Sequence, residues 1–426
     1  MASALHAAAR RGDLQALRAA LQTHPGQLDT PSTPDGMMPL MLALDGRSAG
    51  HAACVEALLE AGPDLSVGDS SGAPALSWAA LSADPALVSR LLQAGASINQ
   101  RDGFGRTPLY IAAQHGHAAC LAVLADTGAG VDATDSDGWT PLMMASRRGH
   151  DACTAELLQR GADVALHNPV GFTALHIAAM FGSEACVRTL LSAGAEVDAP
   201  TSRGQTPLMR AVSEGQDACV GALLEAGASL TVTDKDGATA LTWAAFRGRL
   251  ACARALLAAG SSLAARGTDS AGGLTPLHFA VAWPPAVLRC LLDAPGAADV
   301  LQVQNADGQT LRQAAAKAGR HQAESMLAQA ERLARAQQEA AAQAAAAELL
   351  AEEEQGQRRQ TTAQQLAQAG GSKAAKRQRR KQAAQAAQAA AAASMDHLSE
   401  QAAAAGADAG EDEAAAHHAS AARPAQ

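Results

Sequence analysis

The chain has 426 residues, 48% of them apolar, and its 33 lysines and arginines against 42 aspartates and glutamates give a formal net charge of −9. No stretch approaches the ~18 successive apolar residues of a membrane-spanning helix, and the amino-terminal residues lack the basic-then-apolar pattern of a secretory signal. Composition therefore argues against membrane insertion and secretion, and the net negative charge argues against nucleic acid as the main ligand.

The first predicted element is a helix that begins near Leu5 and ends before Gly12. The segment 5–14 aligns with the segment 175–184, which indicates an internal repeat. A glycine that closes an Asp-x-x-Gly phrase or a variant of it then returns every 33 to 36 residues. We expect about ten units over residues 1–328. The turn glycines are Gly36, Gly72, Gly105, Gly138, Gly171, Gly204, Gly237, Gly273 and Gly308.

The unit at residues 135–161 shows how each repeat is built. It opens with Asp-Ser-Asp-Gly, which favours a turn because glycine accepts a positive φ and aspartate bonds its own backbone. Thr140 stands where a helix N-cap belongs, and Pro141 stands at the first helical position. The pattern predicts one short helix over 142–148 and a second over 151–160, each ended by a glycine.

Helices this short are marginal on their own, because isolated helices need about 12–15 residues to be stable in water. The units must therefore be stabilised by stacking on their neighbours. The recurring phrase Thr-Pro-Leu-x-x-Ala-x-x-x-Gly-His, with Ala-Gly-Ala after the second helix, resembles the ankyrin repeat, and residues 105–117 match it almost completely. The resemblance implies an all-α repeat solenoid of stacked helix-turn-helix pairs with projecting β-hairpin loops.

Several units depart from the common pattern. Three extra positions around residues 45–48 lengthen the region between two helices, and residues 83–85 read Ala-Asp-Pro where Gly-His is usual. The hairpin at 266–272 is longer, and Trp-Pro-Pro at 283–285 replaces an interhelical glycine. The last unit lacks its proline, as a C-terminal cap would. We interpret these departures as kinks or loops and not as domain boundaries.

Cysteines recur with the same period as the turn glycine. A single cysteine at an equivalent position in each unit indicates a small buried side chain in a reducing compartment, and argues against disulfides or a zinc site. These cysteines are Cys54, Cys120, Cys153, Cys186, Cys219 and Cys252.

The sequence contains no phosphate-binding loop, HExxH, GxSxG or CxxC motif. The histidines also follow the repeat register, which favours structural roles over catalysis or metal binding. His51, His117 and His150 follow an interhelical glycine, whereas His6, His176 and His278 follow the leucine of a first helix. We therefore expect no enzymatic activity, no cofactor and no bound metal.

The resemblance implies that a partner binds on a concave groove, formed by the hairpin tips and the exposed side of the first helices. Phe104, Trp139 and Phe172 at three successive hairpins are the best candidates for a binding ridge, since aromatic and arginine side chains anchor many interfaces. The alternative is that each ring lies on the next hairpin and seals the stack. The full candidate set is Phe104, Arg106, His115, Trp139, Arg147, Arg148, Phe172, Met180, Phe181, Phe246 and Arg247.

One position of the first helix is expected to belong to the core. Trp78, Met144, Ile177 and Trp243 occupy it, and we interpret them as structural. Arg210 occupies the same position, where a guanidinium must extend to solvent or find a partner.

The composition changes near residue 320. Residues 320–426 contain no Val, Ile, Phe, Tyr or Trp and are rich in alanine and glutamine. Strong helix formers predict a solvated helix over 329–369, and low complexity predicts a disordered tail over 370–426. A coiled coil is less favoured, because the leucines do not keep a heptad.

A basic block within this tail carries six positive charges in nine residues. It is interpreted as a solvated helical segment, a nuclear import signal or a weak RNA-binding segment. No aromatic residue is interleaved to stack a base, which disfavours nucleic acid. The charged residues are Lys373, Lys376, Arg377, Arg379, Arg380 and Lys381.

These observations predict a monomeric, non-enzymatic adaptor or scaffold of the cytoplasm or nucleus that binds an extended peptide or helix of a partner protein. Two alternatives stay open. One is a nuclear or RNA-associated regulatory protein that acts through the basic block. The other is a regulatory subunit of an enzyme complex.

Overall fold

The computed structural model describes residues 3–31, 34–268, 272–368 and 376–390. Within these ranges the secondary structure is helical, with no strand and three isolated β-bridges, Gly68–Pro74, His167–Thr173 and Gln304–Thr310. The chain forms two compact units, Met1–Arg335 and Ala336–Gln426. The first unit is the repeat solenoid that the sequence predicts.

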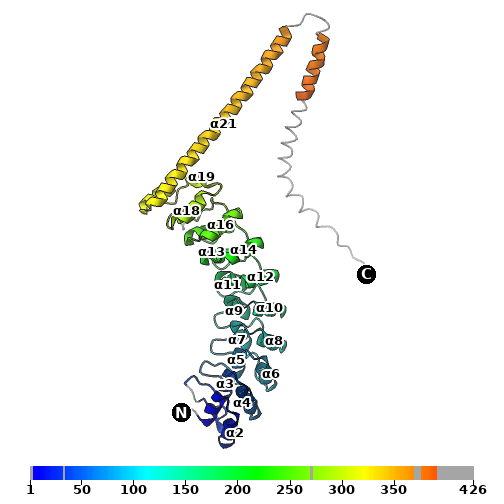
Figure 1. Ribbon diagram of the computed structural model, residues 1–426, viewed down its shortest axis with the longest axis vertical. Helices are drawn as coiled ribbons and strands as arrows, with labels where there is room; N and C mark the ends of the chain where they lie inside the picture. The colour runs from blue at the N-terminus through cyan, green and yellow to red at the C-terminus, as the bar shows by residue number, and fades with distance from the viewer. Residues whose placement is uncertain (1–2, 32–33, 269–271, 369–375, 391–426) are drawn as a thin grey trace, which may run out of the picture. The chain divides into compact units, whose positions relative to one another are not determined.

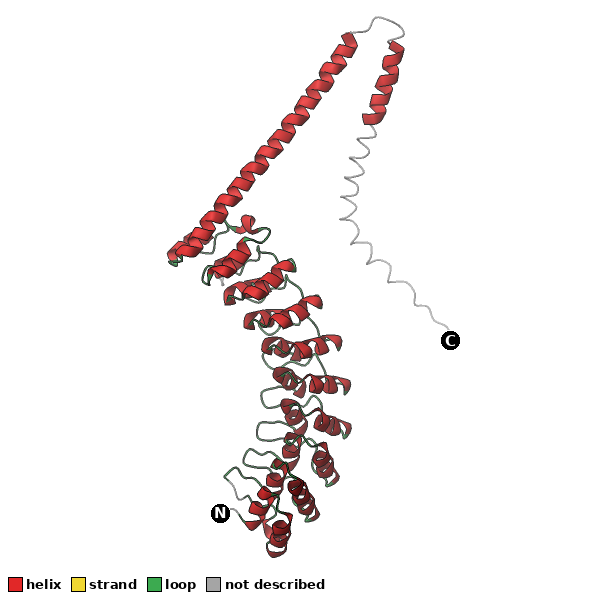
Figure 2. Cartoon of the chain, in the orientation of Figure 1, coloured by secondary structure: helices red, strands yellow, loops and turns green. Residues whose placement is uncertain are grey.

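Two rows of short helices build the first unit, and consecutive members of each row pack side by side (Figures 1 and 2). The first helices are α1 (Ala4–Arg11), α3 (Pro39–Asp45), α5 (Ala75–Leu81), α7 (Pro108–His115), α9 (Pro141–Arg148), α11 (Ala174–Phe181), α13 (Pro207–Glu214), α15 (Ala240–Arg247), α17 (Pro276–Ala280) and α20 (Leu311–Lys317).

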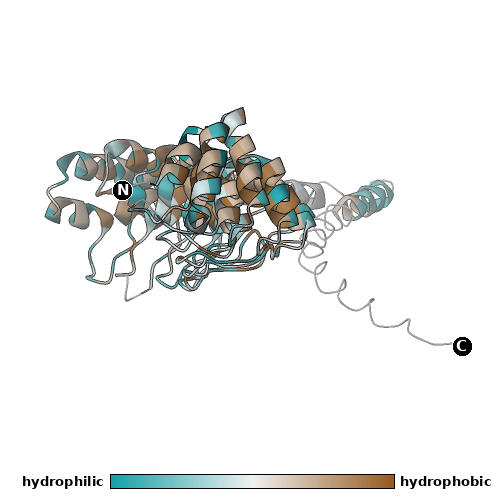
Figure 3. Ribbon diagram, turned by 90° about the horizontal axis from the view of Figure 1, so that it is seen from below, coloured by the Kyte–Doolittle hydropathy of each residue, from teal (hydrophilic) through white to brown (hydrophobic). Residues whose placement is uncertain are grey.

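The second row holds α2 (Leu14–Thr23), α4 (Ala49–Glu60), α6 (Pro85–Gln93), α8 (Ala118–Asp126), α10 (Asp151–Gln159), α12 (Glu184–Ser192), α14 (Asp217–Glu225), α16 (Leu250–Ala258) and α18 (Pro285–Leu292). A 3₁₀ turn, η1 (Pro25–Gln27), and a short helix, α19 (Ala297–Val300), lie in connecting segments. The loops that join successive units lie on one side of the helix layers (Figure 3).

The ends of the helices follow from local sequence, as predicted. The hydroxyl of Thr140 accepts a hydrogen bond from the backbone N–H of Met143, and Pro141 occupies the first turn. Gly149 ends α9 in the left-handed conformation at φ 73°. In the same way, the Thr107 hydroxyl accepts from the backbone N–H of Tyr110 at the start of α7, and Gly116 ends this helix in the left-handed conformation. The caps stabilise each short helix where its backbone would otherwise lack partners.

A column of cysteines runs through the core between the two helix rows. Cys120, Cys153, Cys186 and Cys219 are fully buried, and all seven cysteines of the chain are free. Burial raises the pKa of the Cys153 thiol to about 11, so this thiol stays protonated at neutral pH. The prediction that the periodic cysteines are small buried side chains and not disulfides is confirmed.

A second column of side chains bonds several units to the unit before them. His117 donates its Nε2 hydrogen to the carbonyl oxygen of Leu81 at 3.1 Å, and His150 donates to the carbonyl oxygen of Gln114 at 3.2 Å. Such bonds satisfy carbonyls at the end of a first helix. Other side chains replace histidine at the same position: Gln216 bonds Met180, Arg249 bonds Ser213 and Trp283 bonds Phe246.

The histidines of the first helices bond forward instead. His176 is fully buried, contacts the hydroxyl of Thr173 at 2.9 Å and donates to the carbonyl oxygen of Gln205 in the next hairpin at 3.0 Å. These bonds support the structural interpretation of His117, His150 and His176, whereas the Nε2 of His278 is buried without a hydrogen-bond partner among the described residues.

The irregular units are accommodated within the stack. The residues between α3 and α4 form the lengthened connection that the extra positions predict. Ala83, where other units have glycine, adopts a φ of 66°. Trp-Pro-Pro at 283–285 leaves α17 as a helix of five residues and begins α18.

The C-terminal helix α21 (His321–Gln368) starts in the first unit, where Ala323 and Leu327 are buried against the last repeat. Further along the helix Leu349 and Leu350 are more than 60% exposed, which agrees with the expected solvated helix. Residues 376–390 form another helix, in a segment expected to be disordered. Alanine, glutamine, lysine and arginine have high helix propensity, which accounts for the difference. Residues 369–375 and 391–426 of the predicted tail lie outside the described residues.

Candidate binding surface

We use the name hairpin face for the surface formed by the turns between units and the last turns of the first helices. The arginine–aromatic contacts on it, and the contacts among its Phe and Trp rings, involve Phe104, Arg106, Trp139, Arg147, Phe172, Phe181, Arg210, Trp243, Phe246, Arg247 and Phe279.

The hairpin of Phe104 is organised by a buried aspartate. One carboxylate oxygen of Asp102 accepts hydrogen bonds from the backbone N–H groups of Phe104 and Arg106, and the other accepts from the Arg106 Nε at 2.7 Å. The Arg106 guanidinium carbon lies 4.9 Å from the centre of the Phe104 ring. Phe104 is 59% exposed, so this ring faces solvent in a conformation that its own turn holds.

The next hairpin repeats this design with a tyrosine. Asp135 accepts from the backbone N–H groups of Asp137 and Trp139, and the Tyr110 hydroxyl donates to its second oxygen at 2.7 Å. Burial and the bond to Asp135 raise the pKa of Tyr110, so the phenol is a permanent donor. Trp139 is half-buried and packs partly on the core.

Arg147 joins two units across the hairpin face. Its guanidinium carbon lies 5.3 Å from the Trp139 ring and 5.1 Å from the Phe181 ring of the following unit. Stacking between these rings holds the arginine in an extended conformation while its N–H groups remain available. Phe181 itself is 43% exposed.

The Phe172 side chain is less exposed than we expect for a member of the predicted binding ridge. The ring is half-buried, and its edge meets His176 at a centroid distance of 5.8 Å. The Arg210 guanidinium carbon lies 5.3 Å from the centre of the Phe172 ring. Arg210 also donates to the Met180 sulfur at 2.9 Å. The arginine at the first-helix position that was expected to belong to the core therefore contacts both a ring and a sulfur of the preceding unit. The alternative interpretation, in which a ring seals the stack, thus fits Phe172 better than Phe104.

Three rings meet in the units that follow. Trp243 and Phe279 each make an edge-to-face contact with Phe246, at centroid distances of 5.8 and 5.5 Å. A cavity of about 380 Å³ opens between them, with Asp234 and Asp236 also lining it. The Trp243 indole N–H donates to Asp234 at 2.9 Å, which fixes the ring at the cavity wall.

Trp243 and Phe279 were not among the predicted binding residues. Phe279 occupies the same first-helix column as Arg210 and Trp243, two positions after the leucine, so the repeat register could have identified it. The column was assigned to the core, and in this column Ile177 is indeed fully buried. Trp243 and Phe279 are only half-buried and reach the hairpin face.

The remaining candidates are more isolated. His115 is exposed and stacks on His117 at 6.1 Å, and burial with neighbouring cations lowers its pKa. Arg148 is exposed and forms no ion pair with any described residue. Of the basic block, Lys373 lies outside the described residues. Lys376, Arg377, Arg379, Arg380 and Lys381 lie on the helix 376–390 without ion pairs to the described part of the chain.

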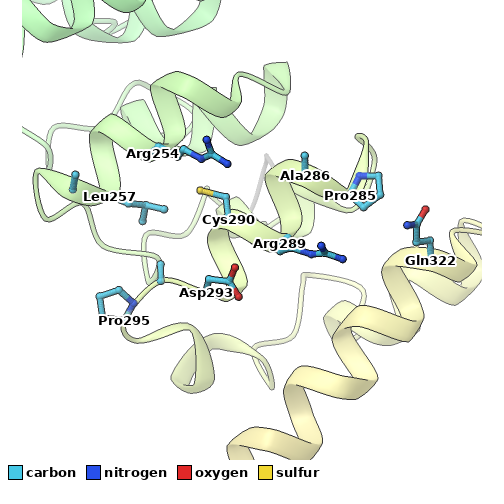
Figure 4. A pocket seen from close by; sticks show the side chains of 11 residues that line it. Arg254, Leu257, Pro285, Ala286, Arg289, Cys290, Asp293, Pro295 and Gln322 are labelled. Carbon is cyan, nitrogen blue, oxygen red and sulfur yellow. The ribbon is translucent and has the colours of Figure 1, made fainter.

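A larger cavity of about 760 Å³ lies on the other row of helices, between α16, α18 and the start of α21 (Figure 4). Arg254, Arg289, Cys290 and Asp293 line it. No predicted site residue belongs to it. Among the described residues, no cluster of three or more His, Cys, Asp or Glu side chains is placed to hold a metal ion. The described helices also include none with the length and hydropathy of a membrane span.

Known proteins contain repeats that are similar to these. Family models described as ankyrin repeats match residues 35–70, 76–168, 154–234 and 226–301. A solved structure of the ankyrin repeat domain of Bcl-3, titled a unique member of the IkappaB protein family, is similar at 28% identity and a TM-score of 0.46, covering 51% of this chain and 96% of that chain. No curated protein matches the chain significantly.

Proposed function

Because the chain belongs to the ankyrin-repeat family, we propose that it is a non-enzymatic adaptor or scaffold that binds a partner protein through the hairpin face. Repeats of this family generally mediate protein–protein interaction. The residues assigned to binding are those of the hairpin face, together with His115, Arg148 and Met180.

The observation that carries the proposal is the pairing of solvent-facing rings with arginines in three alternate units, those of Gly105, Gly171 and Gly237. Phe104, Phe181 and Phe246 are 59, 43 and 45% exposed, although burying such side chains stabilises a folded protein. Each lies against a guanidinium that is already oriented. Exposed aromatic and arginine side chains held in one conformation lose little entropy on binding, which is typical of interface anchors.

The shape and charge of the hairpin face suit an extended peptide or a helix that carries acidic residues. Residues 1–319 hold 21 lysines and arginines against 29 aspartates and glutamates, so the solenoid as a whole is acidic. Four arginines nevertheless lie beside the rings of this surface, at Arg106, Arg147, Arg210 and Arg247. A partner with carboxylates between apolar side chains would match both the rings and the guanidinium groups.

The test is a comparison of three forms of the full chain in a pull-down from cell extract, followed by affinity measurement with the captured partner. Phe104→Ala combined with Phe181→Ala removes two of the three solvent-facing rings of the hairpin face. Arg254→Gln is a control that removes one exposed arginine from the other helix row. We expect the double variant to lose the partner and the control to retain it. Equal capture by all three forms would refute binding through the hairpin face.

A second candidate function rests on the basic helix. Five cations on residues 376–381 form no ion pair with the described part of the chain, so they are free to contact phosphates or an import receptor. Replacing all five by glutamine should then abolish nuclear accumulation or RNA binding. RNA affinity would fall steeply between about 50 and about 300 mM salt, whereas an apolar interface would change little.

A further inference from the structure

The first-helix column is the position two residues after the leucine of each first helix, and the burial of its side chains differs along the solenoid. In four of the earlier units its side chains are buried, since Leu42, Ile111, Met144 and Ile177 are 4, 7, 8 and 0% exposed, whereas Trp78 in another early unit is half-buried. In three consecutive later units the column holds Arg210, Trp243 and Phe279, all of them half-buried. These side chains extend from the core to the hairpin face and create a composite surface there.

Arg210 has donors that the protein does not satisfy. Its Nη2 bonds a sulfur, which is a weak acceptor, and its distance of 3.8 Å to Glu214 exceeds that of a hydrogen bond. Its Nε is buried without a hydrogen-bond partner. Stacking on Phe172 nevertheless fixes the plane of the guanidinium. A fixed guanidinium with unsatisfied donors is suited to a planar anion such as a carboxylate.

A second cation belongs to the next unit, since Arg247 ends α15, which packs against the helix α13 that carries Arg210. Burial lowers the pKa of Arg210. The negative charge of Glu214 raises this pKa, and repulsion by the positive charge of Arg247 lowers it further. The Arg247 guanidinium carbon lies 5.8 Å from both the Trp243 and the Phe246 ring. An anion between the two guanidinium groups would relieve their repulsion.

The aromatic cavity adjoins this pair of arginines, since Trp243 and Phe246 both line the cavity and contact Arg247. Its volume of about 380 Å³ falls in the range of small-molecule sites, about 300–1,000 Å³. The two aspartates that line the cavity differ in their hydrogen bonds and exposure. Asp234 is engaged by Asp236, Ala238 and Trp243, whereas Asp236 is exposed at the turn. The carboxylate of a ligand therefore belongs on the arginine side and its apolar group in the cavity.

Building on the function proposed above, we propose that Arg210 and Arg247 bind a carboxylate of the partner while a neighbouring apolar side chain of the same segment enters the Trp243–Phe246–Phe279 cavity. The recognised ligand is thus a short peptide segment that carries an aspartate or glutamate close to a leucine or phenylalanine.

The probes are fluorescently labelled synthetic peptides in solution, with a Gly/Ser background and one Glu and one Leu at varied spacing. Matched peptides replace Glu by Gln or by Lys, or Leu by Ser. The full chain is used with three substitutions. Arg210→Met introduces the residue that the column has at Met144, so the fold should be retained, and a thermal melt checks this. Phe279→Ala opens the cavity, and Arg254→Gln is the control from the other helix row.

We expect at least one spacing to bind the Glu–Leu peptide about tenfold more tightly than the Gln and Ser peptides, with the dissociation constants measured by fluorescence anisotropy. Arg210→Met should remove the preference for Glu over Gln, Phe279→Ala the preference for Leu over Ser, and Arg254→Gln neither. Equal binding of the Glu and Gln peptides, a preference for Lys, or no binding by any peptide would overturn the inference. Loss of the partner in the Phe104→Ala and Phe181→Ala double variant, together with its retention by Arg210→Met, would overturn the inference and leave the proposed function intact.

Discussion

Single residues show where the repeat pattern is strained. Ala83 adopts a φ of 66° at the position where the next unit has Gly116 at 78°. A left-handed backbone costs an L-residue about 1–2 kcal/mol because its Cβ approaches the following carbonyl. The neighbouring repeats avoid this cost because they have glycine at this position. The strain therefore arises from the alanine side chain at residue 83 and not from the repeat fold.

Replacing Ala83 by glycine should therefore stabilise the protein. We expect a gain of about 0.5–1 kcal/mol, because relief of the left-handed strain exceeds the extra backbone entropy of glycine. The urea midpoint measures the change. The reverse substitution, Gly149→Ala at φ 73°, is the matched control and should destabilise the chain. An unchanged or lowered midpoint for Ala83→Gly would show that Ala83 is not strained.

The cysteine column makes a second residue-scale prediction. Cys290 is the one cysteine that is partly exposed, while burial raises the pKa of Cys120, Cys153 and Cys219 to about 11. Thiolates, and not thiols, react with alkylating agents. Iodoacetamide at pH 8 should therefore label Cys290 first in the folded chain, and the other six cysteines only after denaturation. Peptide mass spectrometry reads out the order, and early labelling of Cys153 would contradict the packing.

At the scale of elements, stability comes from bonds between adjacent units. The hairpin and the first helix are joined by buried histidines such as His176, whose ring bonds Thr173 in its own unit and the Gln205 carbonyl in the next. The Gln205 carbonyl also accepts from the backbone N–H of Thr201, so His176 gives this buried acceptor a second donor and links the two units. Because each such histidine serves two units, its charge state affects the interface between them.

This arrangement predicts a loss of stability in mild acid. Burial lowers the pKa of His176 from 6.5 to about 4, so the unfolded chain binds a proton more tightly than the folded chain. The contribution is fully present above pH 6.5 and is lost as the pH falls towards 4. By pH 5 the loss from this residue should be about 2 kcal/mol. Urea unfolding at pH 7.5 and 5.0 measures it.

The control for this prediction is the exposed histidine of α21. His176→Gln should reduce the difference between the two pH values, although its stability at pH 7.5 will be lower. His321→Gln should leave the pH dependence unchanged, because the His321 side chain is 90% exposed. An identical pH dependence in all three chains would exclude His176 as a source of the effect.

At the scale of the whole molecule, the two units differ in what stabilises them. The first unit has a continuous core through all its repeats. In the second unit, the described side chains of α21 are exposed on every side, with an Arg358–Glu354 ion pair on its surface. A solvated helix opens readily, since its stability depends on propensity alone.

Limited proteolysis tests this difference. Trypsin should cut first in the second unit, at Arg358, Arg359 or the cations of residues 376–381, and leave a stable fragment that contains the repeats, because the exposed helices open more often than the packed unit. Intact-mass analysis over time identifies the fragment. First cuts within residues 34–268 would show that the repeats open more easily than the helix and would contradict the expected domain boundary.

Much of the fold could be predicted from the sequence by itself. The period, the turn glycines, the Thr-Pro helix starts, the buried cysteines and the structural histidines all follow from it. These features depend on residues within one or two turns of the chain, where φ preferences and capping bonds are local. The resemblance to ankyrin repeats then identified the family that the comparisons show.

Only the tertiary structure decided which side chains of the hairpin face meet. Arg147 contacts Phe181, and Arg210 contacts Phe172 and Met180, all from neighbouring units. The register specifies which unit is adjacent, but whether a side chain of the first-helix column is buried or reaches the surface depends on how its neighbours pack. Ile177 is buried there, whereas Trp243 and Phe279 line a cavity, because the larger rings cannot fit within the space between two helices and the next hairpin.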